Sequence, residues 1–212
     1  MNNDNTYTPK AEELLKTTAQ TTKNASKKKI SGFFDWCEII ALSLIFVIIL
    51  FMYSFKVVRI SGDSMLETLH TNEMVVITDF GYTPKPGDIV VISRNVENSA
   101  ETMTASDGPI IKRVIATENQ EVDIKDGKVY VDGKELKEDY LSYSYTAPAI
   151  GEVKFPVTVP KGHIFVLGDN RENSLDSRST NIGNNGMVDS RYVLGHAVYR
   201  IFPLKQAGSL KK

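Results

Sequence analysis

The sequence predicts a mostly β, antiparallel domain behind a single N-terminal transmembrane helix. Three observations indicate this fold class. One long uncharged apolar segment lies near the N-terminus, short apolar runs separated by turn sequences follow it, and no stretch after residue 57 has the spacing of a strong amphipathic helix. With 212 residues, the chain is long enough for one sizeable domain with appendages.

The apolar segment Ile39–Phe55 contains no charged residue. It would extend about 25 Å as a helix, and Trp36 and its neighbours lengthen it toward the thickness of a bilayer. A buried core helix is disfavoured because such helices are rarely apolar on every side. A cleaved signal peptide is disfavoured because a long polar arm precedes the segment and no small-x-small site follows it. The pattern therefore indicates an uncleaved membrane anchor.

Charge is segregated along the chain. Residues 1–30 carry six lysines and three acidic residues, whereas residues 57–212 carry 18 basic and 21 acidic residues. The lysines before the anchor favour a cytoplasmic N-terminus and an exported C-terminal part. The total charge of −1 argues against nucleic-acid binding. Cys37 is the only cysteine and lies at the edge of the anchor, so the exported part has no disulfide and depends on its core.

These observations predict four regions. They are a disordered basic arm at 1–32, the transmembrane anchor at 33–56, an extracytoplasmic β domain at 57–205 and a polar tail at 206–212. The protein is thus expected in the cell membrane, crossing it once, with the lipid bilayer as one partner.

Turn sequences divide the exported part into short strands. Asp126-Gly127 and Asp132-Gly133 bracket "KVYV" and predict two consecutive tight hairpins. The stretches 94–108 and 140–154 are expected to be long excursions from the sheet. The predicted strands are Val57–Ile60, Met74–Thr78, Asp88–Arg94, Ile110–Thr117, Glu121–Lys125, Lys128–Val131, Val157–Val159, His163–Leu167 and Ala197–Phe202.

A serine lies in the turn "SGDSMLETL", between two apolar runs and just beyond the anchor. Ser64 either belongs to an ordinary turn or is a nucleophile. A serine–histidine–aspartate set could be assembled from His70, His163 or His196, but each histidine also has a simple structural role. No cluster of histidine, cysteine and acidic residues has the spacing of a metal site, and we expect neither a metal nor a cofactor.

A lysine base is the other means of activating a serine. Lys112 lies in the apolar strand "GPIIKRVIAT" and shares a strand face with Ile110 and Val114. Desolvation by such neighbours lowers the pKa of a lysine from about 10.4 toward neutrality, which makes it a base. An edge lysine whose stem is packed and whose amine stays in water fits the same pattern. The strand by itself does not decide between these interpretations.

A third polar sequence, "GDNRENSLDSR" at residues 168–178, follows an apolar strand. It is typical of a solvated loop with Asx turns. An ion pair between Asp176 and Arg178 could instead brace the loop, and its hydroxyl groups could orient a buried amine.

These three sequences, in this order behind a membrane anchor, resemble those of the bacterial type I signal peptidases. "SGDSMLETL" is similar to the nucleophile motif of that family, "IIKRVIA" to its lysine motif and "GDNRENSLDSR" to its third motif, over about residues 35–205. The single anchor and modest domain resemble the shorter Gram-positive form. The resemblance implies a barrel-like antiparallel β-sheet peptidase domain. It also implies a membrane-anchored serine endopeptidase that removes N-terminal signal peptides from exported preproteins.

The resemblance also implies roles for single residues. Ser64 would be the nucleophile and Lys112 the general base, and the hydroxyl of Ser174 would orient the lysine amine. Asp176 and Arg178 match the structural ion pair of the family. The strand that ends at Lys112 is expected to pair with the backbone of the substrate.

The substrate pocket is expected to accept small residues before the cut, with Met65, Ile110 and Ile111 as its walls. The chain departs from the family pattern at two positions. Glu67 stands where the family usually has proline, which would fix the backbone after the nucleophile. Gly62 stands where some members supply an oxyanion-hole hydroxyl, so the hole would consist of the Ser64 N–H and water.

Two other functions are compatible with parts of this pattern. A self-cleaving repressor uses similar serine–lysine chemistry, but such proteins are soluble, and the predicted anchor argues against this function. A peptidase-like assembly factor that binds exported proteins without cutting them would be favoured by loss of Ser64 or Lys112. Both residues are present.

Overall fold

The computed structural model describes residues 9–93, 108–141, 145–147 and 153–210, and it divides the chain into two compact units. The first, residues 1–53, is formed by helix α1, which runs from Pro9 to Ser54. Within it, Phe34–Ser54 has a mean hydropathy of 2.4 and is long and apolar enough to cross a membrane. The predicted apolar segment is therefore helical as far as Ser54, and its last residue, Phe55, begins strand β1 (Phe55–Arg59).

The basic arm is helical from Pro9 onward, whereas we expected residues 1–32 to be disordered apart from a weak helix at Pro9–Lys16. The stretch from Ala11 to Lys16 consists of good helix formers. Pro9 occupies the first helical position, where its missing N–H costs nothing. The helix then propagates into the apolar segment because elongation adds one hydrogen bond for each residue fixed. Residues 1–8 lie outside the described part.

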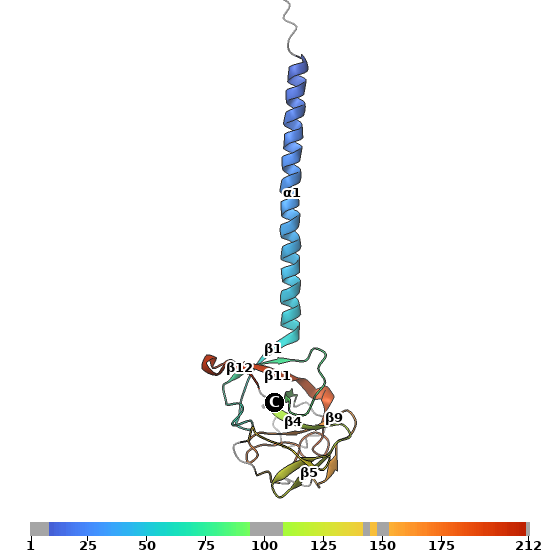
Figure 1. The fold of residues 1–212 in the computed structure, drawn as a ribbon, viewed down its shortest axis with the longest axis vertical. Coiled ribbons are helices and arrows are strands. Elements are labelled where there is room, and N and C mark those ends of the chain that lie inside the picture. Colours follow the sequence, from blue (N-terminus) through green and yellow to red (C-terminus); the bar gives the residue numbers. More distant parts are fainter. Residues whose placement is uncertain (1–8, 94–107, 142–144, 148–152, 211–212) are drawn as a thin grey trace, which may run out of the picture. The chain divides into compact units, whose positions relative to one another are not determined.

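The second unit, residues 54–212, contains two antiparallel sheets. The larger has the order β1-β2-β11-β3-β4-β9-β10, with β12 paired to β11, and the smaller has the order β7-β6-β5-β8. Figure 1 shows β1 and β11 toward one end of this unit and β5 toward the other. The strands are β1 (Phe55–Arg59), β2 (Met74–Thr78), β3 (Ile89–Ile92), β4 (Ile110–Thr117), β5 (Glu121–Lys125), β6 (Lys128–Val131), β7 (Lys134–Glu135), β8 (Val157–Thr158), β9 (His163–Leu167), β10 (Val188–Asp189), β11 (Val193–Phe202) and β12 (Gly208–Ser209).

The mostly β antiparallel fold class is confirmed, and β2, β4, β5, β6 and β9 have the predicted bounds. Helices after residue 57 are short: η1 (Ser190–Tyr192) and η2 (Leu204–Gln206) have three residues each. Both Asp-Gly pairs have positive φ angles at both residues, as consecutive tight hairpins require.

The predicted polar tail contains structure. Gly208 and Ser209 pair with Arg200 and Tyr199 of β11, so the chain adds a strand where we expected only a tail. Composition did not reveal this strand because its pairing uses backbone groups alone. The predicted excursion at 94–108 lies almost wholly outside the described residues.

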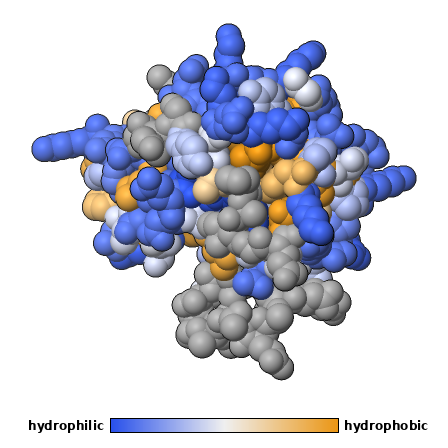
Figure 2. Space-filling view, turned by 90° about the horizontal axis from the view of Figure 1, so that it is seen from below, coloured by the Kyte–Doolittle hydropathy of each residue, from blue (hydrophilic) through white to orange (hydrophobic). Residues whose placement is uncertain are grey.

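The two faces of β3 are both buried, which makes it the centre of the larger sheet. Ile89 and Val91 enter one apolar cluster, and Val90 and Ile92 enter another on the opposite face. A third cluster lies between the two sheets and includes Phe165. Figure 2 shows one face of the unit, where hydrophilic side chains surround smaller apolar areas. Strand β4 lies next to β3, and its residues 111–116 are all buried.

Candidate active site

The turn that carries Ser64 is closed at its base and fixed to the core. Its two ends are joined by hydrogen bonds from Ile60 N to Glu73 O (2.8 Å) and from Asn72 N to Ile60 O (2.9 Å). Met65 and Leu69 are fully buried in the cluster beneath the turn. Met65, which we expected in the pocket wall, thus supports the turn from below, and Ser64 remains half-buried.

Lys112 lies on an apolar face of the sheet. Ile110 and Val114 share this face along β4, and Val90 is its partner on β3. Only 3% of the Lys112 residue is exposed. Its Nζ donates to Ser64 Oγ at 2.7 Å and to the carbonyl oxygen of Ile111 at 3.0 Å. Residues 48 positions apart are thereby brought into direct contact.

The sequence 168–178 forms a loop braced by a buried ion pair. Arg178 Nε donates to Asp176 Oδ1 at 2.8 Å and Nη2 donates to Oδ2 at 2.9 Å, with both side chains fully buried. Asp176 Oδ2 also accepts from the Gly168 N–H at 3.1 Å. Buried ion pairs add little net stability, but their charge-assisted bonds hold the loop in one conformation.

The same loop holds the backbone of the nucleophile turn. Asn170 N donates to Ser64 O, and Asn170 Nδ2 donates to Asp63 O, both at 3.0 Å. Gly168 packs between the two segments. A Cβ added there would lie 2.1 Å from Ser174 Oγ and 2.5 Å from Ser64 O.

Ser174 is buried beside this contact, yet its Oγ has no hydrogen-bond partner among the described residues. The expected bond to the Lys112 amine is therefore not formed in this structure. An unpaired buried hydroxyl is costly. Its role in orienting the amine stays a prediction.

A cleft of about 630 Å³ opens at Ser64 and Lys112. Its apolar lining includes Val58 on β1, Ile60 just after β1, and Ile110 and Ile111 at the start of β4. Two lining residues that sequence reasoning missed are Leu175 and Ile182. Leu175 is the single apolar residue inside the polar sequence "NSLDS", which was the available signal.

Sequence reasoning also missed a second buried ion pair. Arg113, next to Lys112, donates from Nε to Asp169 Oδ1 at 2.9 Å and from Nη2 to Oδ2 at 2.7 Å. Its guanidinium lies 3.9 Å from the centre of the Tyr140 ring. Burial raises the pKa of Tyr140, so this ring stays neutral. The available sequence signal was an arginine in the lysine motif and an aspartate near the start of the third motif.

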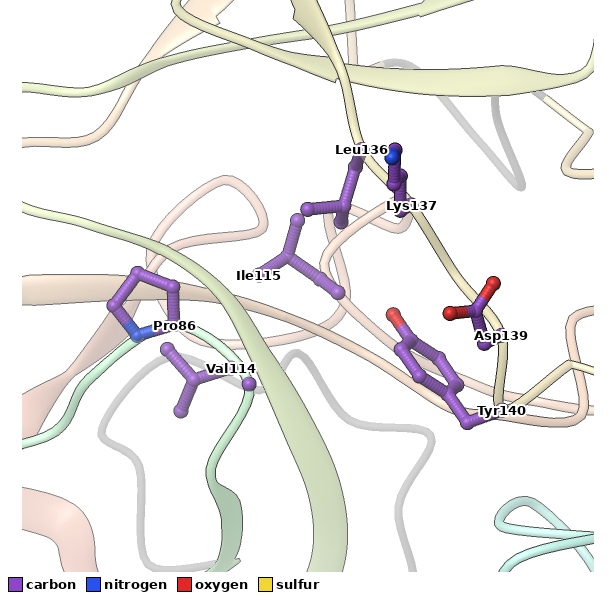
Figure 3. Close-up of a pocket in the computed structure, with 8 residues that line it drawn as sticks. Pro86, Val114, Ile115, Leu136, Lys137, Asp139 and Tyr140 are labelled. Carbon is purple, nitrogen blue, oxygen red and sulfur yellow. The ribbon is translucent and has the colours of Figure 1, made fainter. Parts of the chain in front are cut away.

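Tyr140 also lines a second pocket, of about 410 Å³, together with residues of β4. Figure 3 shows Ile115 pointing toward Leu136, with Tyr140 at the other side of the opening. None of the sequence-predicted site residues lines this pocket.

Each of the three histidines contacts a residue other than Ser64. His70 lies 3.7 Å from Glu73, His163 contacts Lys161 O, and the ring of His196 stacks on Tyr82. The structure thus gives no support to a serine–histidine–aspartate set. Across the described ranges, no group of three or more histidine, cysteine or acidic residues could hold a metal ion.

Known proteins resemble the chain over most of its length. The family model described as signal peptidase, peptidase S26, matches residues 33–202. Signal peptidase I of Bacillus licheniformis is 32% identical, covering 87% of this chain and 97% of that protein. Probable signal peptidase I-1 of a Synechocystis strain is 33% identical, covering 81% and 84%. A crystal structure of a signal peptidase I from Enterococcus faecalis has 29% identity and a TM-score of 0.42, covering 54% of this chain and 97% of that one.

These matches show the class of protein: it is a serine peptidase, an enzyme that hydrolyses peptide bonds. The chain belongs to the signal peptidase family, peptidase S26. The resemblance drawn from three short motifs is therefore confirmed at the level of the family.

Gly168→Ala tests the contact between the loop and the nucleophile turn. Because the added methyl group would overlap the Ser64 carbonyl, peptidase turnover should fall about 100-fold or more. The control is Gly208→Ala, where no atom lies within 4 Å of the new Cβ. Turnover is measured on folded, detergent-solubilised protein, and equal activity of the two variants would contradict the proposed contact.

Proposed function

We propose that this protein is a membrane-anchored serine endopeptidase that removes signal peptides from exported preproteins by means of a Ser64–Lys112 dyad. The observation that carries this proposal is the 2.7 Å contact between Ser64 Oγ and the amine of a lysine that is 3% exposed. Burial withdraws the amine from water and so favours its neutral form, which is the form able to accept a proton.

The proposed reaction has two stages. Neutral Lys112 takes the proton of Ser64 as Oγ attacks the carbonyl carbon of the scissile bond. The resulting ammonium then gives this proton to the departing amine of the mature protein, which leaves an ester on Ser64. In the second stage Lys112 removes a proton from water, and the water oxygen attacks the ester carbonyl. The bond to Ser64 Oγ then breaks, the lysine ammonium returns the proton to Oγ, and the signal peptide leaves with a new carboxyl group. The Ser64 N–H, with water, would stabilise the negative oxygen in both stages.

The substrate is proposed to bind as an added strand along β4. Strand β3 pairs with Ile110–Lys112 from one side, whereas the pairing of β9 is confined to Arg113–Thr117. The other edge of Ile110–Lys112 therefore borders the cleft and supports pairing with an extended peptide. The apolar side chains of Val58 and Ile60, which also line the cleft, favour small apolar residues before the cut.

The bilayer is the second proposed partner. β1 begins one residue after the apolar helix segment ends. Apolar side chains on β1 and β11 remain exposed, as a surface held next to lipid would be. They are Phe55, Val57, Leu194, Tyr199 and Phe202. The lysines before the segment support a cytoplasmic N-terminus and an extracytoplasmic catalytic domain.

Removing either member of the dyad should nearly abolish cleavage of a preprotein that has Ala-x-Ala before the cut. Ser64→Ala and Lys112→Ala act on one unit, so the double variant should be little worse than either single variant. His70→Ala is the control and should keep most activity, since His70 is exposed and contacts Glu73. Sequencing the new N-terminus locates the cut, and efficient cleavage by Lys112→Ala would exclude the proposed base.

Topology is tested with protease added to cells stripped of their wall. The C-terminal domain should be digested while a tag at the N-terminus survives, because the charge asymmetry favours a cytoplasmic N-terminus. Both should be digested after detergent lysis, which serves as the control. Survival of the C-terminal domain in intact cells would contradict the proposed export.

The pH dependence of turnover follows from the proton that Lys112 must accept. Below its midpoint the amine is charged and inactive as a base, so the rate should rise with pH. The rate should level off in the mildly alkaline range, well below the ordinary lysine pKa of about 10.4, because burial favours the neutral amine. A single-turnover pH profile measures this, and an acidic optimum would argue against a lysine base.

A further inference from the structure

Ser64 and Lys112 belong to different segments of the chain, and one buried carboxylate is bonded to both segments. Asp169 accepts two hydrogen bonds from Arg113, the residue that follows Lys112 in β4. Its Oδ2 also accepts from the hydroxyl of Thr68, in the turn that carries Ser64. The side chains of Arg113 and Asp169 are each 1% exposed, so both are shielded from competing water.

Thr68 is coupled tightly to the nucleophile. The backbone between them forms a compact turn in which Leu66 N donates to Asp63 O at 3.3 Å and Leu69 N donates to Met65 O at 2.8 Å. The Thr68 carbonyl accepts from Arg200 Nη1 at 3.3 Å. A hydroxyl bond at Thr68 therefore restrains the whole short turn, including Ser64.

We propose that Thr68 is a positioning residue for the peptidase reaction: its hydroxyl bond to Asp169 sets the place of the Ser64 turn relative to the strand that carries Lys112. This inference rests on the proposed dyad. The path runs from Ser64 through its turn to Thr68, across Asp169 to Arg113, and along one peptide bond to Lys112.

The Thr68 hydroxyl can be tested separately from the ion pair that it contacts. If it is removed, both oxygens of Asp169 still accept from Arg113, so no buried charge loses its partner. Substitution of Asp169 itself would leave the Arg113 guanidinium buried without its carboxylate. A loss of activity could then come either from unfolding or from displacement of the Ser64 turn. Thr68→Val keeps the branched shape of the side chain but replaces the hydroxyl with a methyl group, whereas Thr68→Ser keeps the hydroxyl.

The experiment compares full-length Thr68→Val, Thr68→Ser and wild type in detergent on one preprotein substrate. Thr68→Val should lower kcat about 10- to 100-fold, because small misplacement of reacting groups has effects of that size. KM should change less than about twofold, since Thr68 does not line the cleft. Thr68→Ser should restore most of kcat, and Tm should fall by no more than about 2–4 °C in either variant.

Thr117→Val is the matched control, because it also removes a threonine hydroxyl bond, to Gln120 at 3.2 Å, at the far end of β4. It should retain wild-type kcat. A wild-type kcat for Thr68→Val, or an equal loss in Thr68→Ser, would overturn the positioning role. If wild type and Lys112→Ala cleave equally, the dyad itself is wrong. Failure of the proposed function is thereby distinguished from failure of the role of Thr68.

Discussion

The contact between the Lys112 amine and the Ser64 hydroxyl is the constraint on which the rest of the domain depends. In the proposed dyad the lysine acts as a base, and removal from water favours the neutral amine that this role needs. Strand β4 sets Lys112 among Ile110, Val114 and Val90, in the densely packed middle of the larger sheet. The serine then has to be brought to the amine, and most polar contacts of the site serve that end.

The loop at 168–178 joins the two halves of the site. Asn170 binds the backbone of the Ser64 turn, while Asp169 binds Arg113 beside Lys112. The loop is held by the buried pair of Asp176 and Arg178. Each buried pair loses hydration and contributes little net stability. We therefore infer that the two pairs serve to hold the loop in one conformation. This agrees with a site in which the placement of two reacting groups decides the rate.

The location of the cleft connects the site with the proposed substrate. Its walls are the end of β1 and the start of β4, and β1 begins directly after the apolar helix segment. An extended peptide in this cleft would contact the apolar side chains of Val58 and Ile110. The exposed apolar side chains of β1 and β11 are compatible with the proposed contact of the domain with lipid.

The sequence by itself determined the apolar helix, the bounds of five strands and the two Asp-Gly hairpins, because these depend on local periodicity and turn chemistry. Its three motifs also identified the family and singled out Ser64 and Lys112. Strand alternation placed Lys112 on a face with Ile110 and Val114, but it could not say what covers that face. Only the tertiary structure decided that the lysine is buried, that Met65 lies beneath the turn rather than in the cleft, and that Thr68, Asp169 and Arg113 meet. Those contacts join segments far apart in the chain, and their formation depends on how the sheets pack.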